Sequence, residues 1–176
     1  MIYFVRHGQT NDNVEYRIQG NKPLNENGLN QAKDLAEQLK GVYFDVCFCS
    51  PLIRTVQTLQ EILYYHKDLK VVYDDRIQER DYGELVGLLA KDIDGYLNRW
   101  KSDAYWPYKT ETVDEMYNRV AGFYNDLKNN YKDKSILIVS HCGVGRMTRA
   151  YFYGKPQDND YSKYEMKNCE IMKIDI

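Results

Sequence analysis

The sequence predicts an α/β fold, a three-layer α/β/α sandwich around a mixed central sheet that is mostly parallel. Short apolar runs typical of buried strands alternate with longer segments that repeat an apolar residue every three or four positions. Polar segments rich in arginine and histidine follow three of the apolar runs. No Pro- or Gly-rich linker divides the 176 residues, so we expect a single domain over residues 1–176.

The first half of the chain predicts two strand–helix units and then a short strand. The apolar run 2–5 is the first strand, and an apolar stripe over 28–40, with Gly41 at its end, predicts the first helix. The run 45–49 is the second strand. The Ser50-Pro51 pair then suits the N-cap and first position of a helix that carries Arg54. A third strand is expected at 71–73.

The second half predicts an irregular region followed by another strand–helix unit. We expect a helix near 89–100 and then a loop rich in aromatic residues. The capping box of Thr112 and Glu115 opens a helix that extends to about residue 131. The apolar run 136–139 is the next strand, another helix follows it, and a strand near 170–176 closes the fold.

Composition excludes several classes of protein. Twenty-four Lys and Arg against 26 Asp and Glu give a net charge of −2, which argues against a nucleic-acid partner. No apolar stretch approaches the ~20 residues that span a bilayer, and no signal-peptide pattern is visible, so we expect no membrane partner and a cytoplasmic location. The four cysteines and three histidines do not have zinc-binding spacing, so no metal or other cofactor is predicted.

Charged and polar side chains follow the predicted strands where a ligand would bind. Arg6-His7-Gly8, Ser50–Arg54 and His141–Gly143 each come directly after an apolar run. Because the carboxyl ends of parallel strands lie at one edge of a sheet, two arginines and two histidines are expected to converge there. Such a cluster suits a tetrahedral oxyanion, and the backbone N–H groups of Cys142 and Gly143 at a helix start would add donors.

The same cluster can carry out phosphoryl transfer. A neutral histidine has one free ring nitrogen that can attack phosphorus, which divides hydrolysis into two displacements. A carboxylic acid must protonate the leaving oxygen and then activate water. Glu79, just after the third strand, is the candidate, and Glu84 on the far side of Gly83 is the weaker choice. The expected partner is a small phosphorylated substrate.

Four motifs together resemble the signature of the histidine phosphatase superfamily, the phosphoglycerate mutase-like clan. They occur in the order found in that family and span most of the chain. One such motif alone would be weak, whereas the four together are highly specific. The motifs are Arg6-His7-Gly8-Gln9-Thr10 followed by Asn13, Ser50 to Thr58, Glu79-Arg80-Asp81-Tyr82-Gly83, and Ser140-His141-Cys142-Gly143-Val144.

The resemblance implies a metal-independent phosphatase and a role for each matching residue. His7 would be the phosphorylated nucleophile, and Glu79 the general acid and then the base. Other matching residues would bind the phosphoryl group or line the pocket, and residues 80–112 would be a lid or insertion region. These binding residues are Arg6, Asn13, Gln19, Gly20, Arg54, His141, Cys142 and Gly143.

Three alternatives remain beside this interpretation. A mutase of the same clan would return the phosphoryl group to a phosphosugar acid, and a non-catalytic module would bind a phosphorylated ligand without turnover. Cys142 could act as a thiolate nucleophile, although the arginine needed six residues later falls one position late, at Arg149. Aromatic residues could also cover an organic leaving group. They are Tyr82, Trp100, Tyr105, Trp106 and Tyr108.

Overall fold

The computed structural model describes residues 1–104 and 106–175, which fold around one five-stranded sheet. The strand order is β3-β2-β4-β1-β5, in which the first four strands are parallel and β5 is antiparallel to β1. The mixed, mostly parallel sheet predicted from the sequence is therefore confirmed. The strands are β1 (Ile2–Arg6), β2 (Val46–Cys49), β3 (Val71–Tyr73), β4 (Ile136–Ser140) and β5 (Ile171–Ile174).

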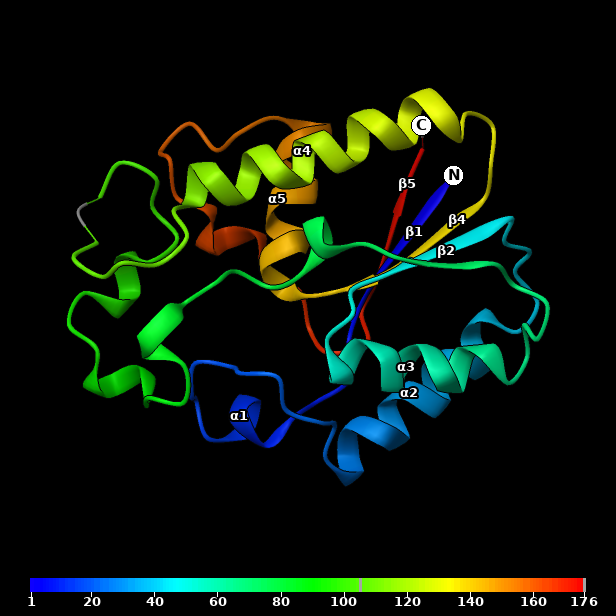
Figure 1. Cartoon of the computed structure of the whole chain (residues 1–176), viewed down its shortest axis with the longest axis horizontal. Coiled ribbons are helices and arrows are strands. Elements are labelled where there is room, and N and C mark those ends of the chain that lie inside the picture. Colours follow the sequence, from blue (N-terminus) through cyan, green and yellow to red (C-terminus); the bar gives the residue numbers. More distant parts are fainter. Residues whose placement is uncertain (105, 176) are drawn as a thin grey trace.

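Helices cover both faces of the sheet, which confirms the three-layer sandwich (Figure 1). The helices α2 (Glu26–Leu39) and α3 (Ile53–Leu63) pack against one face and bury one apolar cluster. The helices α4 (Val113–Asn130) and α5 (Cys142–Tyr153) bury a larger cluster on the other. Every residue of β4 is buried, as expected for a central strand covered on both sides.

The helix expected near 89–100 is wrong. This region contains two separate 3₁₀ turns, η3 (Ala90–Asp92) and η4 (Tyr96–Asn98), and a third, η2 (Gly83–Leu85), precedes it. Gly95, inside the expected helix, has a φ of 69°, and a positive φ interrupts a right-handed helix. The segment 83–104 lies beside the carboxyl ends of the strands, outside the sandwich layers (Figure 1).

The predicted cap at Ser50-Pro51 is also wrong. The N-cap of α3 is Leu52, which makes no side-chain capping bond. The Ser50 hydroxyl instead pairs with His141, so a residue typical of helix caps serves the site. In contrast, the capping box of Thr112 and Glu115 is present at the start of α4, as predicted.

Two further differences concern helix ends. The first long helix begins two residues earlier than predicted, because the side chain of Asn25 caps the Gly28 N–H. It ends at Leu39, and its C-cap is Lys40, not Gly41.

A one-turn helix, α1 (Asn11–Val14), is not predicted by the sequence, because it is too short to show an apolar stripe. A capping box between Thr10 and Asn13 stabilises its start.

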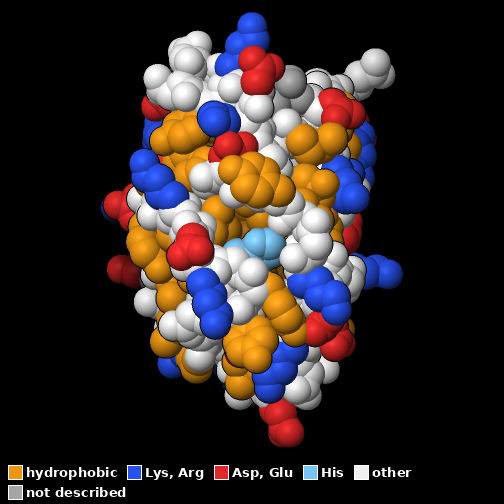
Figure 2. Space-filling model, turned by 90° about the vertical axis from the view of Figure 1, so that its right-hand side faces the viewer, with side chains coloured by type: hydrophobic (Ala, Val, Ile, Leu, Met, Phe, Trp, Pro, Cys, Tyr) orange, Lys and Arg blue, Asp and Glu red, His pale blue; other side chains and the backbone are white. Residues whose placement is uncertain are grey.

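Surface charge follows the near-neutral composition. Figure 2 shows Lys and Arg side chains interspersed with Asp and Glu over one face, with hydrophobic groups between them and no continuous basic band. His7 and His141 are both fully buried. None of the helices within the described ranges, 1–104 and 106–175, is both long and apolar enough to cross a membrane.

Candidate active site

The strand ends bring the predicted cluster together. His7 follows β1, His141 follows β4, and the two rings lie 5.2 Å apart between centroids. Arg54, in the first turn of α3, places its Nε 3.1 Å from His7 Nε2. All three side chains are at most 1% exposed, so this cluster lies beneath the surface of the site.

The hydrogen bonds of His7 define its tautomer. Nδ1 lies 2.6 Å from the Gly8 carbonyl oxygen, which can only accept, so Nδ1 carries the proton. Nε2 accepts the Nε–H of Arg54 and therefore has a lone pair. Nε2 is thus a potential nucleophile that faces a guanidinium.

Burial and neighbouring positive charge keep both histidines neutral. The pKa of His7 is held well below its usual 6.5 by burial, with Arg54 and Arg6 acting in the same direction. The pKa of His141 is also well below 6.5, again mainly through burial and then Arg54. Burial lowers the pKa of Arg54 to about 10, so its guanidinium remains charged at neutral pH.

Several buried polar atoms around His7 have no protein partner. Within residues 1–104 and 106–175 they include Arg6 Nε, Arg54 Nη2 and His141 Nδ1. Arg6 is otherwise held by the Met166 carbonyl, 2.5 Å from Nη1, and Arg54 Nη1 donates to the Gly20 carbonyl at 2.7 Å. A buried donor without a partner is costly, so this cluster is suited to receive the oxygens of an anion.

Glu79 approaches the same point from the segment after β3. Its Oε1 accepts the N–H of Arg80 at 2.9 Å, and its Oε2 accepts the N–H of Gly143 at 3.3 Å. A Cβ atom at residue 143 would collide with Glu79 Oε1 and come within 2.8 Å of Trp100. Glycine is therefore required at position 143 for the carboxylate to reach the start of α5.

A cavity of about 410 Å³ opens in front of this cluster. The predicted site residues whose side chains line this cavity come from the end of β1 and the loop after it, from the segment after β3 and from α5. Gly20 and Gly143 contribute backbone groups, to Arg54 and Glu79 respectively. The predicted residues that line the cavity are Arg6, Asn13, Gln19, Glu79 and Cys142, whereas His7, Arg54 and His141 lie beneath it.

Sequence reasoning missed two residues that line the cavity and hold the backbone around His7 and Gly20. Asn168, just before β5, donates to the His7 carbonyl at 3.0 Å and to Asn13 Oδ1 at 3.3 Å. Asp12 accepts the N–H of Gly20 at 3.3 Å. No pattern marks a single Asn ahead of the last strand, but Asp12 lies inside the first motif and could have been included.

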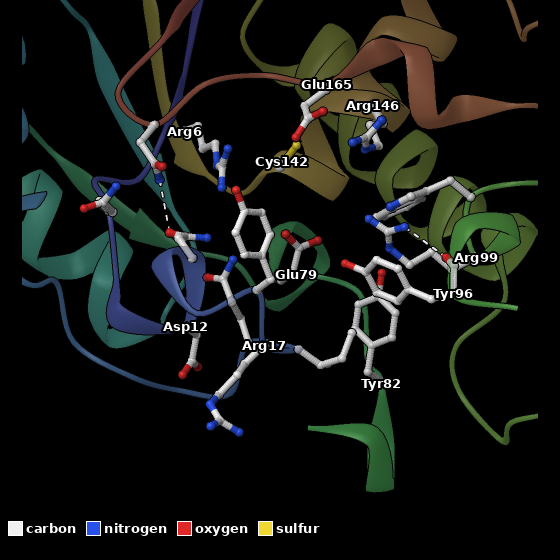
Figure 3. Close-up of a pocket in the computed structure, with 17 residues that line it drawn as sticks. Arg6, Asp12, Arg17, Glu79, Tyr82, Tyr96, Arg99, Cys142, Arg146 and Glu165 are labelled. Atoms are coloured by element: carbon white, nitrogen blue, oxygen red, sulfur yellow. Dashed lines mark hydrogen bonds between the residues drawn. The ribbon is translucent and has the colours of Figure 1, made fainter. Parts of the chain in front are cut away.

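The outer part of the cavity contains charges that the motifs do not identify. Figure 3 shows Arg99 and Arg146 on the side opposite Arg6, with Glu165 close to Cys142. Tyr16, Arg17 and Tyr96 also line the cavity. These residues come from three loops and α5, and only the fold places them together.

Arg80 attaches the 80–112 segment to the Glu79 loop. Its Nε donates to the Glu111 carbonyl at 2.6 Å, and its Nη1 donates to the Arg99 carbonyl. Its guanidinium also lies over the rings of Tyr82 and Trp100, 5.3 Å from each centroid. Arg80 therefore connects both the middle and the end of this segment to the loop that carries Glu79.

The predicted aromatic cover is only partly realised. Tyr82 and Trp100 line the cavity. Trp106 and Tyr108 are absent from its lining; they pack on each other and against the cluster that contains Tyr82. Tyr105 lies outside the described residues.

The thiol alternative lacks the local geometry that it requires. Thr148 donates to the Val144 carbonyl inside α5, and Arg149 points to Glu170 at 3.5 Å, so neither closes a loop around Cys142. Among the described residues, no group of three or more His, Cys, Asp or Glu side chains is placed to hold a metal ion.

Comparison with known proteins gives a consistent result along the whole chain. The sequence model of the histidine phosphatase superfamily (branch 1) matches residues 2–176. Phosphoserine phosphatase 1 of Hydrogenobacter thermophilus is 34% identical over 197 residues, covering 99% of this chain and 92% of that protein.

Two solved structures have the same fold. YhfR of Bacillus stearothermophilus superposes with a TM-score of 0.86 at 26% identity, covering 97% of this chain and 88% of that one. A phosphoserine phosphatase mutant of Entamoeba histolytica, in complex with phosphoserine, gives a TM-score of 0.83 at 25% identity and covers 97% and 87%. The fold shared with these two structures is therefore consistent with the family that the order of the sequence motifs indicates.

Proposed function

The chain belongs to the histidine phosphatase superfamily, and from that premise we propose that it hydrolyses phosphomonoesters through a phosphohistidine at His7, without a metal ion. The observation that supports this most strongly is the set of buried, unpartnered donors around a neutral His7 whose lone pair is on Nε2. Residues 1–176 act as one domain, in which the segment 80–112 forms one wall of the site.

The first step transfers the phosphoryl group to the enzyme. His7 Nε2 forms a bond to phosphorus while the ester P–O bond breaks on the opposite side. Glu79 gives its proton to the leaving alcohol oxygen. Arg54 releases Nε2 and, together with Arg6 and His141, binds the phosphoryl oxygens, on which negative charge develops in the transition state.

The second step restores the enzyme. Glu79, now a carboxylate, takes a proton from water as the water oxygen bonds to phosphorus and the Nε2–P bond breaks. Inorganic phosphate leaves, Glu79 is protonated again, and Arg54 can return to Nε2. The cationic side chains alone neutralise the transferred group, which is why we propose a reaction without a metal.

The test measures phosphate release from a panel of phosphomonoesters in excess EDTA. The panel includes phosphoserine, because two similar proteins are named for it. We expect wild type to release phosphate and His7→Ala to lose more than about 10³-fold of that rate. Activity that survives in His7→Ala, or that EDTA abolishes, contradicts the proposal.

Two further results would indicate other functions. Exchange between isomers of phosphoglycerate without net phosphate release would indicate a mutase. Binding of phosphomonoesters with no turnover by wild type would indicate a phospholigand-binding module.

A further inference from the structure

The charged groups that line the cavity differ in whether the protein already uses them. Asp12 accepts from Gly20, Glu79 accepts from two backbone N–H groups, and Arg17 pairs with Glu15 at 2.6 Å. The charges on Arg99 and Glu165, like those on Arg6 and Arg146, form no ion pair within residues 1–104 and 106–175.

Arg99 is held in place with its charge unneutralised. Its guanidinium stacks on the Tyr96 ring at 3.6 Å, and Nη1 donates to the Tyr96 carbonyl at 3.0 Å. Arg146 lines the same side of the cavity, is only 4% exposed, and has a buried Nε without a partner. A fixed, unneutralised guanidinium favours a carboxylate, which accepts two parallel hydrogen bonds from it.

Glu165 offers the opposite charge. It is exposed, lines the cavity and has no hydrogen-bonded side-chain partner in the part of the chain that the structure describes. Figure 3 shows its carboxylate next to Cys142, between Arg6 and Arg146. An ammonium group on the substrate would complement this carboxylate.

We propose that Arg99 and Glu165 select a leaving group that carries both a carboxylate and an ammonium, so that the substrate class is phosphorylated amino acids. Arg99 binds the carboxylate and Glu165 binds the ammonium, while Arg6, Arg54 and His141 hold the phosphate. A cavity of about 410 Å³ accommodates an alcohol of this small size. This inference rests on the proposed phosphatase activity and adds its specificity.

The experiment measures kcat/KM for four esters that differ by one group at a time. Phosphoserine has both charges, phosphoethanolamine lacks the carboxylate, 3-phosphoglycerate has a hydroxyl in place of the ammonium, and glycerol 1-phosphate lacks both. The ratio of phosphoserine to 3-phosphoglycerate reports the ammonium contact. The ratio of phosphoserine to phosphoethanolamine reports the carboxylate contact.

Wild type is expected to favour phosphoserine by about fivefold or more in each ratio, since each contact is a partly exposed charge pair. Glu165→Gln should reduce the ammonium ratio to near one and keep the carboxylate ratio. Arg99→Met should do the reverse. Ratios within one enzyme preparation are insensitive to the fraction that folds. Glu26→Gln and Lys33→Met, two exposed changes on α2, are the matched controls and should keep both ratios.

The inference is overturned if wild type hydrolyses all four esters with equal kcat/KM, or if both variants change the two ratios alike. Glycerol 1-phosphate distinguishes failure of the specificity from failure of the activity. Its hydrolysis in the absence of selectivity refutes only the specificity, whereas failure to hydrolyse any of the four esters refutes the phosphatase proposal as well.

Discussion

The floor of the cavity and its wall are held in place by different kinds of interaction. The floor is the buried cluster of His7, Arg54 and His141 beneath the cavity, and it is positioned by strands β1 and β4 and by the first turn of α3. The wall, residues 80–104 and 106–112, contains short turns and is attached through bonds from Arg80 to backbone carbonyls. Substitutions should therefore change chemistry in the floor and substrate fit in the wall.

The largest effect is expected for Glu79→Gln, which removes the proton that the leaving alcohol needs. Loss of general acid–base catalysis costs about 10² to 10⁴-fold in rate. Alkyl esters should lose more kcat/KM, which reports the transfer of the phosphoryl group to His7, than p-nitrophenyl phosphate, whose leaving group needs no proton. Measuring both esters checks this, and equal losses for the two esters would show that Glu79 is not the acid.

The next effect tests whether the floor needs the guanidinium fork of Arg54. One nitrogen contacts His7, a second holds the Gly20 carbonyl and a third has no partner among the described residues. Lysine keeps the charge but loses this geometry, so we expect Arg54→Lys to lower kcat by roughly 10² to 10³-fold. Steady-state kinetics with Lys33→Arg as a surface control measure it. A near wild-type kcat in the Arg54→Lys variant would mean that charge alone suffices.

A smaller effect is expected in the wall. Arg80→Met keeps a long side chain but removes the bonds to Glu111 and Arg99. We expect KM for a small ester to rise by about tenfold while kcat falls less, since each lost charged hydrogen bond is worth ~1.5–3 kcal/mol, part of which relaxation recovers. A fall in kcat with unchanged KM would contradict this prediction, because it would mean that Arg80 affects the chemical step and not substrate binding.

The smallest effect concerns pH and stability. Both floor histidines have pKa values well below 6.5 in the folded protein, mainly through burial. The unfolded chain binds more protons below pH 6.5, so the free energy of unfolding is retained above that pH and falls as pH drops towards 5. Each histidine contributes a slope of up to about 1.4 kcal/mol per pH unit.

Urea denaturation at pH 7 and pH 5 measures this slope, and His141→Asn should reduce it by roughly half. A stability that does not change between the two pH values would show that the floor does not bury two neutral histidines.

The contrast between the floor and the wall also explains which parts of the site can be predicted from the sequence. The floor is predictable because apolar runs identify strands, and parallel strands end at one edge, so His7 and His141 have to meet. The wall is not predictable because no periodicity specifies its turns. The positive φ of Gly95 interrupts the helix expected near 89–100, and the contacts of Arg80 reach 19 and 31 residues along the chain.

Residues with a misleading local signal are also misassigned from the sequence. Ser50 looks like a helix cap in the sequence, but in the fold its hydroxyl lies 2.7 Å from His141 Nε2. Asn168, Arg99 and Glu165 have no local signal, because long-range folding alone brings them to the cavity. A single sequence therefore predicts the groups that follow strand ends better than the groups that long-range folding brings to the cavity.

The central claim is that His7 carries the phosphoryl group, and the most direct measurement is to trap the intermediate. Wild type mixed with excess substrate is quenched in base, which preserves phosphohistidine, and then digested for mass spectrometry. We predict one phosphoryl group, on the peptide that contains His7. With p-nitrophenyl phosphate, whose leaving group needs no proton, we predict that this group accumulates in Glu79→Gln, because only dephosphorylation is then slowed. A phosphoryl group on Cys142, or turnover with no phosphorylated enzyme at any time, would contradict the account.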